Sequence, residues 1–222
     1  MTTKKKYDDL ISKQFNELTR REQYPDLQIK RNSEDGWIVY GTLYYRAINE
    51  GHLIKDKFEI RIEIPPDYPK STPVVYDEDG RTKGYPHTQN DGKLCLAEPV
   101  KEWMIFTENP TLLYYVQKLV IPYLYRFRFI EAHNGEKPWG ERSHGGVGII
   151  EHYEEYFNVT GKEKVLGLLE HLSIHKEIKG HPKCPCGSGE LIRNCHVDEL
   201  RRLKEVPKKI VKYVIDQIKS SK

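Results

Sequence analysis

Residues 84–103 read Gly-Tyr-Pro-His-Thr-Gln-Asn-Asp-Gly-Lys-Leu-Cys-Leu-Ala-Glu-Pro-Val-Lys-Glu-Trp, and the rest of the chain is organised around them. Cys95 is the only cysteine among the first 183 residues, lies between two leucines and follows an Asn-Asp-Gly turn signal. His87 lies eight residues before this thiol and Trp103 eight residues after it. A single thiol between leucines is most often a small buried hydrophobic side chain, so its chemistry has to be judged from the sequence on either side.

The sequence before this stretch predicts one helix followed by an antiparallel sheet. Apolar side chains recur at helical spacing in residues 7–22, and Asp8 and Asp9 lie near the expected N-terminus, where the helix dipole favours acidic groups. Residues 57–64 alternate apolar and charged side chains, as a half-buried strand does. Other strands are expected at residues 27–30, 37–47 and 74–76. Successive short strands, joined by turns rich in glycine, asparagine and proline, favour a meander.

The sequence after residue 76 predicts a long loop and then several helices. Residues 77–110 lack sustained periodicity, and loops of this length in compact domains are often functional. Asn109 as the cap and Pro110 as the first helical residue open the next helix, which Pro122 should end or kink. Further helices are expected at residues 147–157, 162–176 and 206–222, and the last should pack on the rest of the fold. This order of elements predicts an α+β fold.

A second loop, residues 133–148, carries an unusual density of reactive side chains for a segment rich in glycine. Loops with such chemistry often fold over an active site, and the hypothesis is that Glu141, Arg142 or His144 line a cleft beside Cys95, with Trp103 at its edge. The alternative is a solvated connector that Trp139 anchors.

Near the C-terminus, Cys184, Cys186, Cys195 and His196 supply four ligands of the kind that tetrahedral zinc prefers. The intervening glycines allow the chain to turn tightly around an ion. The pattern Cys-Pro-Cys-Gly-Ser-Gly followed by Cys-His resembles the SEC-C zinc motif found at the end of the bacterial SecA translocase. That resemblance implies a structural zinc ion and a module that docks partner proteins and performs no chemistry.

Four motifs follow one another around Cys95. A strand ends in the turn Pro65–Pro69, Tyr85-Pro86-His87 follows, Gly92–Leu96 surrounds the thiol, and Trp103 comes last. In this order they resemble the ubiquitin-conjugating (UBC-like) enzymes, and their bacterial branch in particular, over roughly residues 5–130. The resemblance implies a UBC-like fold with an N-terminal helix, a four-stranded antiparallel meander, an active-site loop and C-terminal helices, with Cys95 as the nucleophile.

The resemblance also implies a reaction. Cys95 would take the C-terminal glycine of a ubiquitin-like modifier from an activating enzyme as a thioester and pass it to an amine of an acceptor protein. His87 stands where the family has an asparagine that steadies the loop and the oxyanion; an imidazole can also donate a hydrogen bond, but it titrates near neutrality. Asn90 and Gly92 are candidates for oxyanion or loop support. The base for the incoming amine stays open among Asp79, Asp91 and Glu98.

Composition sets wider limits. The 222 residues suffice for a conjugating-enzyme-like domain at 1–178 and a zinc motif with a C-terminal helix at 179–222. The formal net charge of +3 is too small to indicate a nucleic-acid partner, and no apolar stretch reaches the roughly 18 residues that a membrane span needs. Clustered cysteines and a start without an apolar signal region favour a cytoplasmic protein with reduced thiols.

Two other functions stay open at this point. One is a non-catalytic UBC-fold protein-binding module with a zinc docking motif. The other is a nucleic-acid or secretion adaptor built around the C-terminal motif, against which the small net charge and the long preceding domain argue. Bacterial relatives often occur in antiphage-defence gene clusters, where they sometimes link a cyclic-nucleotide synthase to a target, so the resemblance adds such a synthase to the candidate partners.

Overall fold

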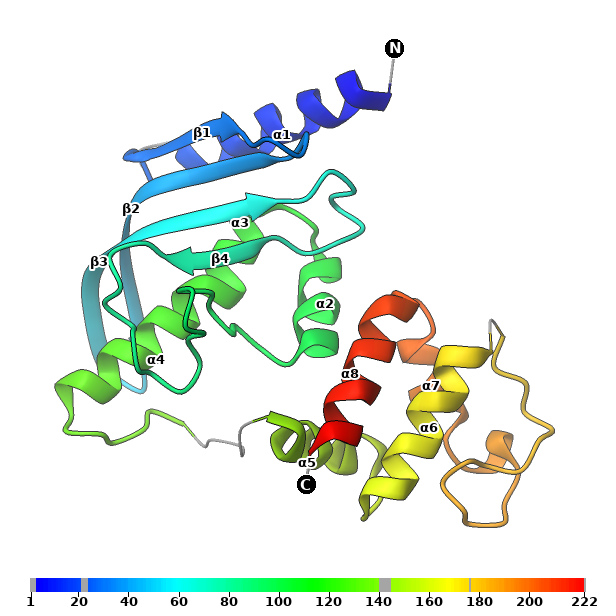
Figure 1. The fold of residues 1–222 in the computed structure, drawn as a ribbon. Helices are drawn as coiled ribbons and strands as arrows, with labels where there is room; N and C mark the ends of the chain where they lie inside the picture. Colours follow the sequence, from blue (N-terminus) through cyan, green and yellow to red (C-terminus); the bar gives the residue numbers. More distant parts are fainter. Residues whose placement is uncertain (1–2, 21–23, 140–144, 176, 222) are drawn as a thin grey trace. The chain divides into compact units, whose positions relative to one another are not determined.

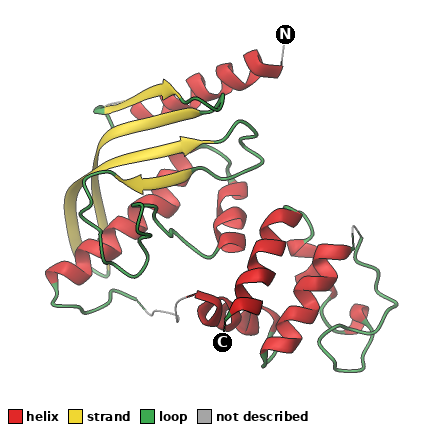
Figure 2. Cartoon of the chain, in the orientation of Figure 1, coloured by secondary structure: helices red, strands yellow, loops and turns green. Residues whose placement is uncertain are grey.

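The computed structural model describes residues 3–20, 24–139, 145–175 and 177–221 of the chain (Figure 1). The chain divides into two compact units: Met1–Ala97 with Lys101–Gly140, and Glu98–Val100 with Glu141–Lys222. The first unit contains a sheet, several helices and Cys95, whereas the described part of the second is built from helices and loops (Figure 2).

In the described part of the first unit, four strands form one antiparallel sheet in the order β1-β2-β3-β4. The strands are β1 (Leu27–Arg31), β2 (Trp37–Asn49), β3 (His52–Ile64) and β4 (Val74–Asp77). This confirms the predicted α+β class and the meander. Both β2 and β3 are longer than expected, because Asn49 pairs with His52 across a two-residue turn in which Glu50 and Gly51 have positive φ.

Helical segments share one hydrophobic core with this sheet. They are α1 (Thr3–Thr19), α2 (Pro99–Glu108), α3 (Leu112–Tyr115), the π-helical segment η2 (Val116–Val120) and α4 (Ile121–Ala132). Alternate strand residues such as Leu43 and Ile62 share one core with Ile11 of α1 and Leu124 of α4, and all four side chains are fully buried. The sheet and these helices therefore form the scaffold that carries the Cys95 loop.

One buried glutamine joins three parts of this scaffold. The side chain of Gln14 on α1 is 5% exposed; its oxygen accepts hydrogen bonds from the Tyr68 hydroxyl (2.5 Å) and the Leu112 N–H (3.0 Å). Its amide donates to the Pro110 carbonyl at 3.2 Å. The turn after β3, where the Tyr68-Pro69 peptide is cis, is thus fixed to α1 and to the start of α3.

The predicted position of Asp8 is wrong in one respect. α1 begins at Thr3, so Asp8 lies beyond the first turn of the helix, where the dipole has little effect. Its carboxylate instead accepts a hydrogen bond from the Trp37 indole at 3.2 Å and forms an ion pair with Arg31. Asp8 therefore fastens α1 to the first two strands.

The helices after the Cys95 loop also differ from the prediction. Residues 99–108 form α2, where a loop was expected. Thr111, not Asn109, is the N-cap of α3, because its hydroxyl accepts a hydrogen bond from the Tyr114 N–H at 3.2 Å. The helix does not end at Pro122, because α4 continues to Ala132. The wider π-helical turn η2 directly precedes α4 and accommodates Pro122, which has no N–H to donate.

The second unit contains α5 (Gly145–Phe157), α6 (Lys162–Ile174), the 3₁₀ turn η3 (Ile192–Asn194), α7 (Val197–Leu203) and α8 (Lys208–Ser220). The apolar side of α8 is buried against α5 and α6, as expected for the C-terminal helix. Because α5 and α6 pack on α8, these three helices belong to the same compact unit.

Candidate functional site

Cys95 lies on the surface of the first unit, at the end of a small hairpin that folds back on β4. The hairpin turns at residues 90–92, pairs Thr88 with Leu94, and is joined to β4 by the bridge between Tyr76 and Lys93. Leu94 is 4% exposed and its N–H donates to the Val75 carbonyl at 2.8 Å, whereas the next side chain, Cys95, is exposed. The anchored leucine therefore directs the thiol outwards, and the common buried role of a single cysteine does not apply here.

His87 is the cross-strand partner of Cys95 in this hairpin. Its carbonyl accepts hydrogen bonds from the Cys95 N–H at 2.8 Å and from the Tyr123 hydroxyl of α4 at 3.2 Å. The same hydroxyl lies 2.7 Å from the Thr88 hydroxyl, and burial raises the pKa of Tyr123. The imidazole of His87 packs edge-on against the Tyr85 ring, with centroids 5.5 Å apart. Through Tyr123, α4 holds the backbone beside the thiol in place.

Gln89 is a residue that the sequence motifs missed. Its side-chain amide donates to the Cys95 sulfur, with Nε2 and Sγ 3.7 Å apart. The Asn-Asp-Gly turn signal could have revealed it: a hairpin that turns at residues 90–92 places residue 87 opposite residue 95 and makes residue 89 the diagonal neighbour of residue 95.

Gly92 supports the loop through its backbone conformation. Its φ is +85°, a conformation that favours glycine. A Cβ at this position would lie 2.8 Å from the Asp77 carbonyl oxygen, which is too close for a contact with a backbone atom. Its carbonyl accepts the Asp77 N–H at 2.9 Å, and its own N–H donates to the Gln89 carbonyl at 3.0 Å. Because that N–H already donates within the turn, it is not available to an oxyanion in this conformation. Gly92 therefore supports the loop.

The start of the loop is organised by a buried carboxylate. Asp77 is 6% exposed, and its Oδ2 accepts hydrogen bonds from the Thr82 N–H (2.5 Å) and hydroxyl (2.7 Å). A hydrogen bond with Asp77, burial and the charge of Asp77 raise the pKa of Asp79.

The other two candidate bases have structural contacts of their own. Asp91 accepts the Lys93 N–H at 3.1 Å within the hairpin turn. Glu98 belongs to the second unit, where it accepts a hydrogen bond from the Tyr153 hydroxyl at 3.2 Å and lies 3.9 Å from the His152 imidazole. These contacts do not decide which of the three carboxylates deprotonates an amine.

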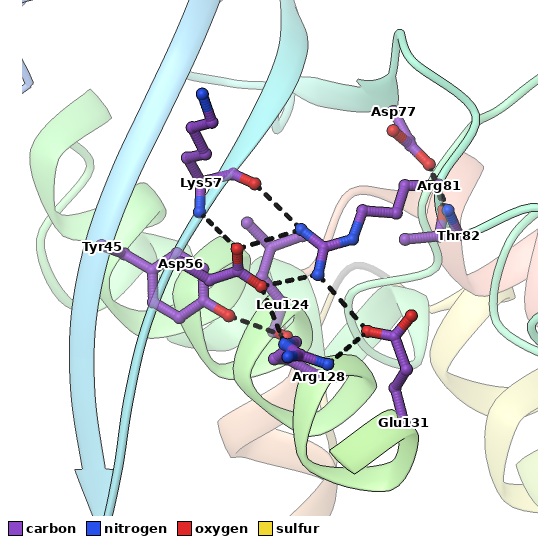
Figure 3. Close-up of polar contacts among 9 residues, drawn as sticks. All are labelled: Tyr45, Asp56, Lys57, Asp77, Arg81, Thr82, Leu124, Arg128 and Glu131. Carbon is purple, nitrogen blue, oxygen red and sulfur yellow. Dashed lines mark hydrogen bonds and ion pairs between the residues drawn. The ribbon is translucent and has the colours of Figure 1, made fainter.

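An ion-pair network joins the same loop to the scaffold (Figure 3). The guanidinium of Arg81 binds both oxygens of Asp56 on β3, at 3.1 and 2.7 Å, and donates to the Lys57 carbonyl at 3.1 Å. Glu131 on α4 accepts from Arg81 at 3.3 Å and from Arg128 at 2.7 Å, and Arg128 also contacts Asp56 at 3.2 Å. The loop is therefore held by a strand and a helix on one side and by Asp77 on the other.

The predicted cleft residues are placed only in part. Trp103 lies on α2, is half-buried, and has an indole N–H that is buried without a hydrogen-bond partner among the described residues. Glu141, Arg142 and His144 lie outside the described residues, so their position beside Cys95 stays a prediction. Asn90 is exposed at the tip of the hairpin.

The second candidate site is the Cys/His cluster of the second unit. The ligand atoms of Cys184, Cys186, Cys195 and His196 all lie within 4.8 Å of one another. The Cys186 and Cys195 sulfurs are 3.6 Å apart, and His196 Nδ1 lies 3.2 Å from the Cys184 sulfur and 3.1 Å from the Cys195 sulfur. In a tetrahedral site with metal–sulfur bonds of about 2.3 Å and metal–nitrogen bonds of about 2.0 Å, these separations are roughly 3.5–3.8 Å. The sulfur–sulfur separation lies in this range and the two nitrogen–sulfur separations are shorter, so the four ligand atoms are close enough together to surround one ion.

The histidine in this cluster is oriented as a ligand. Its Nε2 lies 2.8 Å from the Phe157 carbonyl at the end of α5, so Nε2 carries the proton and the lone pair of Nδ1 faces the three sulfurs. Burial raises the pKa of the Cys184 thiol to about 12. Burial opposes ionisation of Cys186 as well, but hydrogen bonds from Ser188 and the neighbouring thiols lower the pKa of Cys186 to about 6. A cation is what allows all three sulfurs to act as thiolates together.

The rest of the second unit is shaped around this cluster. A Cβ on Gly167 of α6 would lie 2.7 Å from the Pro185 carbonyl, so only glycine lets the helix approach the Cys184–Cys186 turn this closely. The Cys184 N–H donates to the Glu190 carbonyl at 2.7 Å. Since α5 orients the histidine and α6 contacts the turn, metal binding and the packing of these helices are coupled.

Comparison with protein-family models and with curated proteins finds no match to this chain. The likeness to ubiquitin-conjugating enzymes therefore rests on the motifs around Cys95. Within the described ranges, every helix is too short or too polar to cross a membrane.

Proposed function

We propose that this chain is a ubiquitin-conjugating-like enzyme with a UBC-like fold, in which Cys95 carries the C-terminal glycine of a protein modifier as a thioester. The observation that carries the proposal is the exposed Cys95 thiol, which lies on a hairpin fastened to the scaffold and has an amide donor at its sulfur. The order of helix, four-stranded meander, thiol loop and helices supports the fold assignment.

In the first step, the Cys95 thiolate attacks the carbonyl carbon of the thioester that joins the modifier to its activating enzyme. A C–S bond to Cys95 forms, the tetrahedral oxyanion collapses, and the thiolate of the activating enzyme leaves. The exposure of Cys95 is what this step requires, because two large proteins must bring their sulfur atoms together. Thiolates suit the exchange because they are both nucleophiles and leaving groups.

In the second step, an amine of the acceptor protein attacks the Cys95 thioester. A C–N bond forms, the Cys95 thiolate leaves, and the proton of the amine passes to a nearby base. The candidates for this base are Asp79, Asp91 and Glu98. His87 and Asn90 are candidates for donating hydrogen bonds to the oxyanion.

We propose that the ion held by Cys184, Cys186, Cys195 and His196 is Zn²⁺ in a structural role. Three thiolates and one imidazole leave no open coordination position, and such closed sites stabilise folds. Metal analysis of the purified protein should give one equivalent of zinc, and Cys186→Ser should abolish it. One equivalent of another metal would contradict the assignment.

The partners in this proposal are an activating enzyme, a ubiquitin-like modifier or another protein with a C-terminal glycine, such as a cyclic-nucleotide synthase, and an acceptor protein. A cytoplasmic location and a role in bacterial antiphage defence belong to the same proposal. They follow from the resemblance of the motifs around Cys95 and from the clustered cysteines.

A gel assay tests the proposal. The protein is incubated with ATP and with the activating enzyme and modifier encoded beside it, and a reductant-sensitive adduct is expected. Cys95→Ala should form no adduct, and Cys95→Ser should form one that resists reductant, because an oxygen ester replaces the thioester. A wild-type protein that forms no adduct with any encoded neighbour would favour a non-catalytic binding module.

A further inference from the structure

We propose that Gln89 is a catalytic residue of this site, whose side-chain amide donates hydrogen bonds to the charge that develops at the Cys95 sulfur and at the thioester oxygen. This inference rests on the proposed thioester function. It assigns a role to a residue that lies outside the motifs shared with the conjugating enzymes.

Four backbone N–H groups next to the thiol are already used within the loop in this conformation. The Gly92, Lys93, Leu94 and Cys95 N–H groups each already donate to an acceptor: the Gln89 carbonyl at 3.0 Å, the Asp91 carboxylate at 3.1 Å, the Val75 carbonyl at 2.8 Å and the His87 carbonyl at 2.8 Å. Freeing one of them would break the hairpin that positions the thiol. A side-chain donor at the sulfur can stabilise the oxyanion without that cost.

The Gln89 amide is placed to be that side chain. Its Nε2 lies 3.7 Å from the Cys95 sulfur. Its backbone is fixed, because its N–H donates to the Lys93 carbonyl at 2.8 Å and its carbonyl accepts the Gly92 N–H. Only side-chain rotation is needed to follow the reaction.

The chemistry suits a carboxamide. When the thioester carbonyl is attacked, negative charge forms on an oxygen bonded to the same carbon as the sulfur, so a donor at the sulfur is also close to that oxygen. A carboxamide has two N–H donors, one of which can remain at the sulfur while the other binds the oxyanion. No proton is transferred to or from Gln89, and its contribution should therefore not vary with pH. A contribution from the His87 imidazole would vary near neutral pH.

The test compares Gln89→Ala and Gln89→Glu with Gln117→Ala, which removes an exposed glutamine of η2 in the same unit. Each protein is charged with modifier, and release of the modifier to free lysine is followed from pH 6 to pH 9. Loss of one oxyanion donor costs about 10²–10³ in rate where water is excluded. Because Gln89 is exposed, we expect a smaller effect, with release slowed by about tenfold to hundredfold in Gln89→Ala. The loss should be the same at every pH. Gln89→Glu should be at least as slow, because its carboxylate repels the charge, and Gln117→Ala should stay within about twofold.

A second measurement does not need the modifier. Alkylation of Cys95 by iodoacetamide at pH 7 should be about threefold slower in Gln89→Ala and slower still in Gln89→Glu, the size expected for one solvent-exposed hydrogen bond to a thiolate. If the wild-type protein forms no thioester, the proposed function fails, and the alkylation rates still decide the role of Gln89.

Two results would overturn the inference. One is Gln89→Ala with wild-type rates in both assays. The other is Gln89→Glu with wild-type rates while Gln89→Ala is slow and melts at a lower temperature, which would show that the side chain only supports the fold.

Discussion

Replacing Arg81 by glutamine tests whether the network in Figure 3 holds the Cys95 loop on the scaffold. The substitution keeps a side chain with an amide hydrogen-bond donor but removes the charge and the bidentate contact with Asp56. It also removes the guanidinium from above the Phe58 ring, where its central carbon lies 4.4 Å from the ring centroid.

The expected loss of unfolding free energy in Arg81→Gln follows from how exposed the Arg81 and Asp56 side chains are. The Arg81 and Asp56 side chains are 29% and 16% exposed, so their pair lies between a solvated and a buried ion pair. Solvated pairs contribute about 0.2–1 kcal/mol, and breaking a buried pair costs about 3–5 kcal/mol. Arg128 and the Lys57 N–H stay within hydrogen-bond distance of Asp56 and limit the loss. The variant also loses the cation–π contact with Phe58, which contributes about 0.5 kcal/mol. Together, these losses should lower the free energy of unfolding by about 1.5–2.5 kcal/mol.

Urea unfolding of Arg81→Gln, Asp56→Asn and the double variant measures this. The cycle should give a coupling energy of about 1 kcal/mol between the two side chains. Lys4→Gln is the matched control: its partner is Asp35, both side chains are more than half exposed, and its effect on stability should be much smaller than that of Arg81→Gln. An Arg81→Gln cost no larger than that of Lys4→Gln, or a coupling energy near zero, would refute the reasoning.

The same pair predicts a pH dependence. Burial alone would raise the pKa of Asp56, but hydrogen bonds from Arg81 and the Lys57 backbone and the charges of Arg81 and Arg128 hold that pKa below its ordinary value. A carboxyl with a depressed folded-state pKa stabilises the fold fully above its unfolded pKa of about 3.9 and loses this contribution as the pH falls through the folded value. The stability difference between wild type and Arg81→Gln should therefore be constant near neutral pH and shrink below about pH 4.

Three further predictions concern single positions. Gly92→Ala should cost about 2–3 kcal/mol, measured by urea unfolding, because its positive φ and the contact with the Asp77 carbonyl exclude a Cβ; a cost under about 0.5 kcal/mol would contradict the turn geometry. Removing the metal with a chelator should lower the helical circular dichroism signal, and Cys186→Ser should give the same lowered signal. An unchanged spectrum in both experiments would show that the cluster does not stabilise the second unit. Tyr115→Phe should cost about 1–2 kcal/mol, since its buried hydroxyl lies 2.8 Å from the Pro73 carbonyl oxygen and 2.8 Å from Glu102 Oε1 and donates a hydrogen bond to one of them; a neutral effect on thermal unfolding would argue against that hydrogen bond.

Much of the scaffold could be predicted because its pattern is local. The alternation in residues 57–64 predicted a half-buried strand, and β3 buries alternate side chains there. Its first half, from His52, was missed because those residues are ordered by pairing with β2 across the Glu50-Gly51 turn. The helix α2 was missed for a similar reason: it is short, and the fully buried Phe106 shows that tertiary packing, more than periodicity, stabilises it.

The sites differ in how visible they are in the sequence. The four ligands of the Cys/His cluster lie within thirteen consecutive residues, from Cys184 to His196, so ligand type and spacing alone predicted it. The Cys95 site depends on which side chains the hairpin places next to one another. The turn signal was recognised but was not used to pair residues across the hairpin, so Gln89 was missed as the diagonal neighbour of Cys95. Whether its amide reaches the sulfur depends in addition on a side-chain rotamer.

Mass spectrometry of the charged protein tests the central claim most directly. After incubation with ATP, activating enzyme and modifier, the intact protein should gain the mass of the modifier less one water, and peptide mapping should place the adduct on Cys95. The mass gain should disappear on treatment with a thiol reductant. A mass gain on a lysine alone, or none under conditions in which the activating enzyme itself becomes charged, would contradict the account.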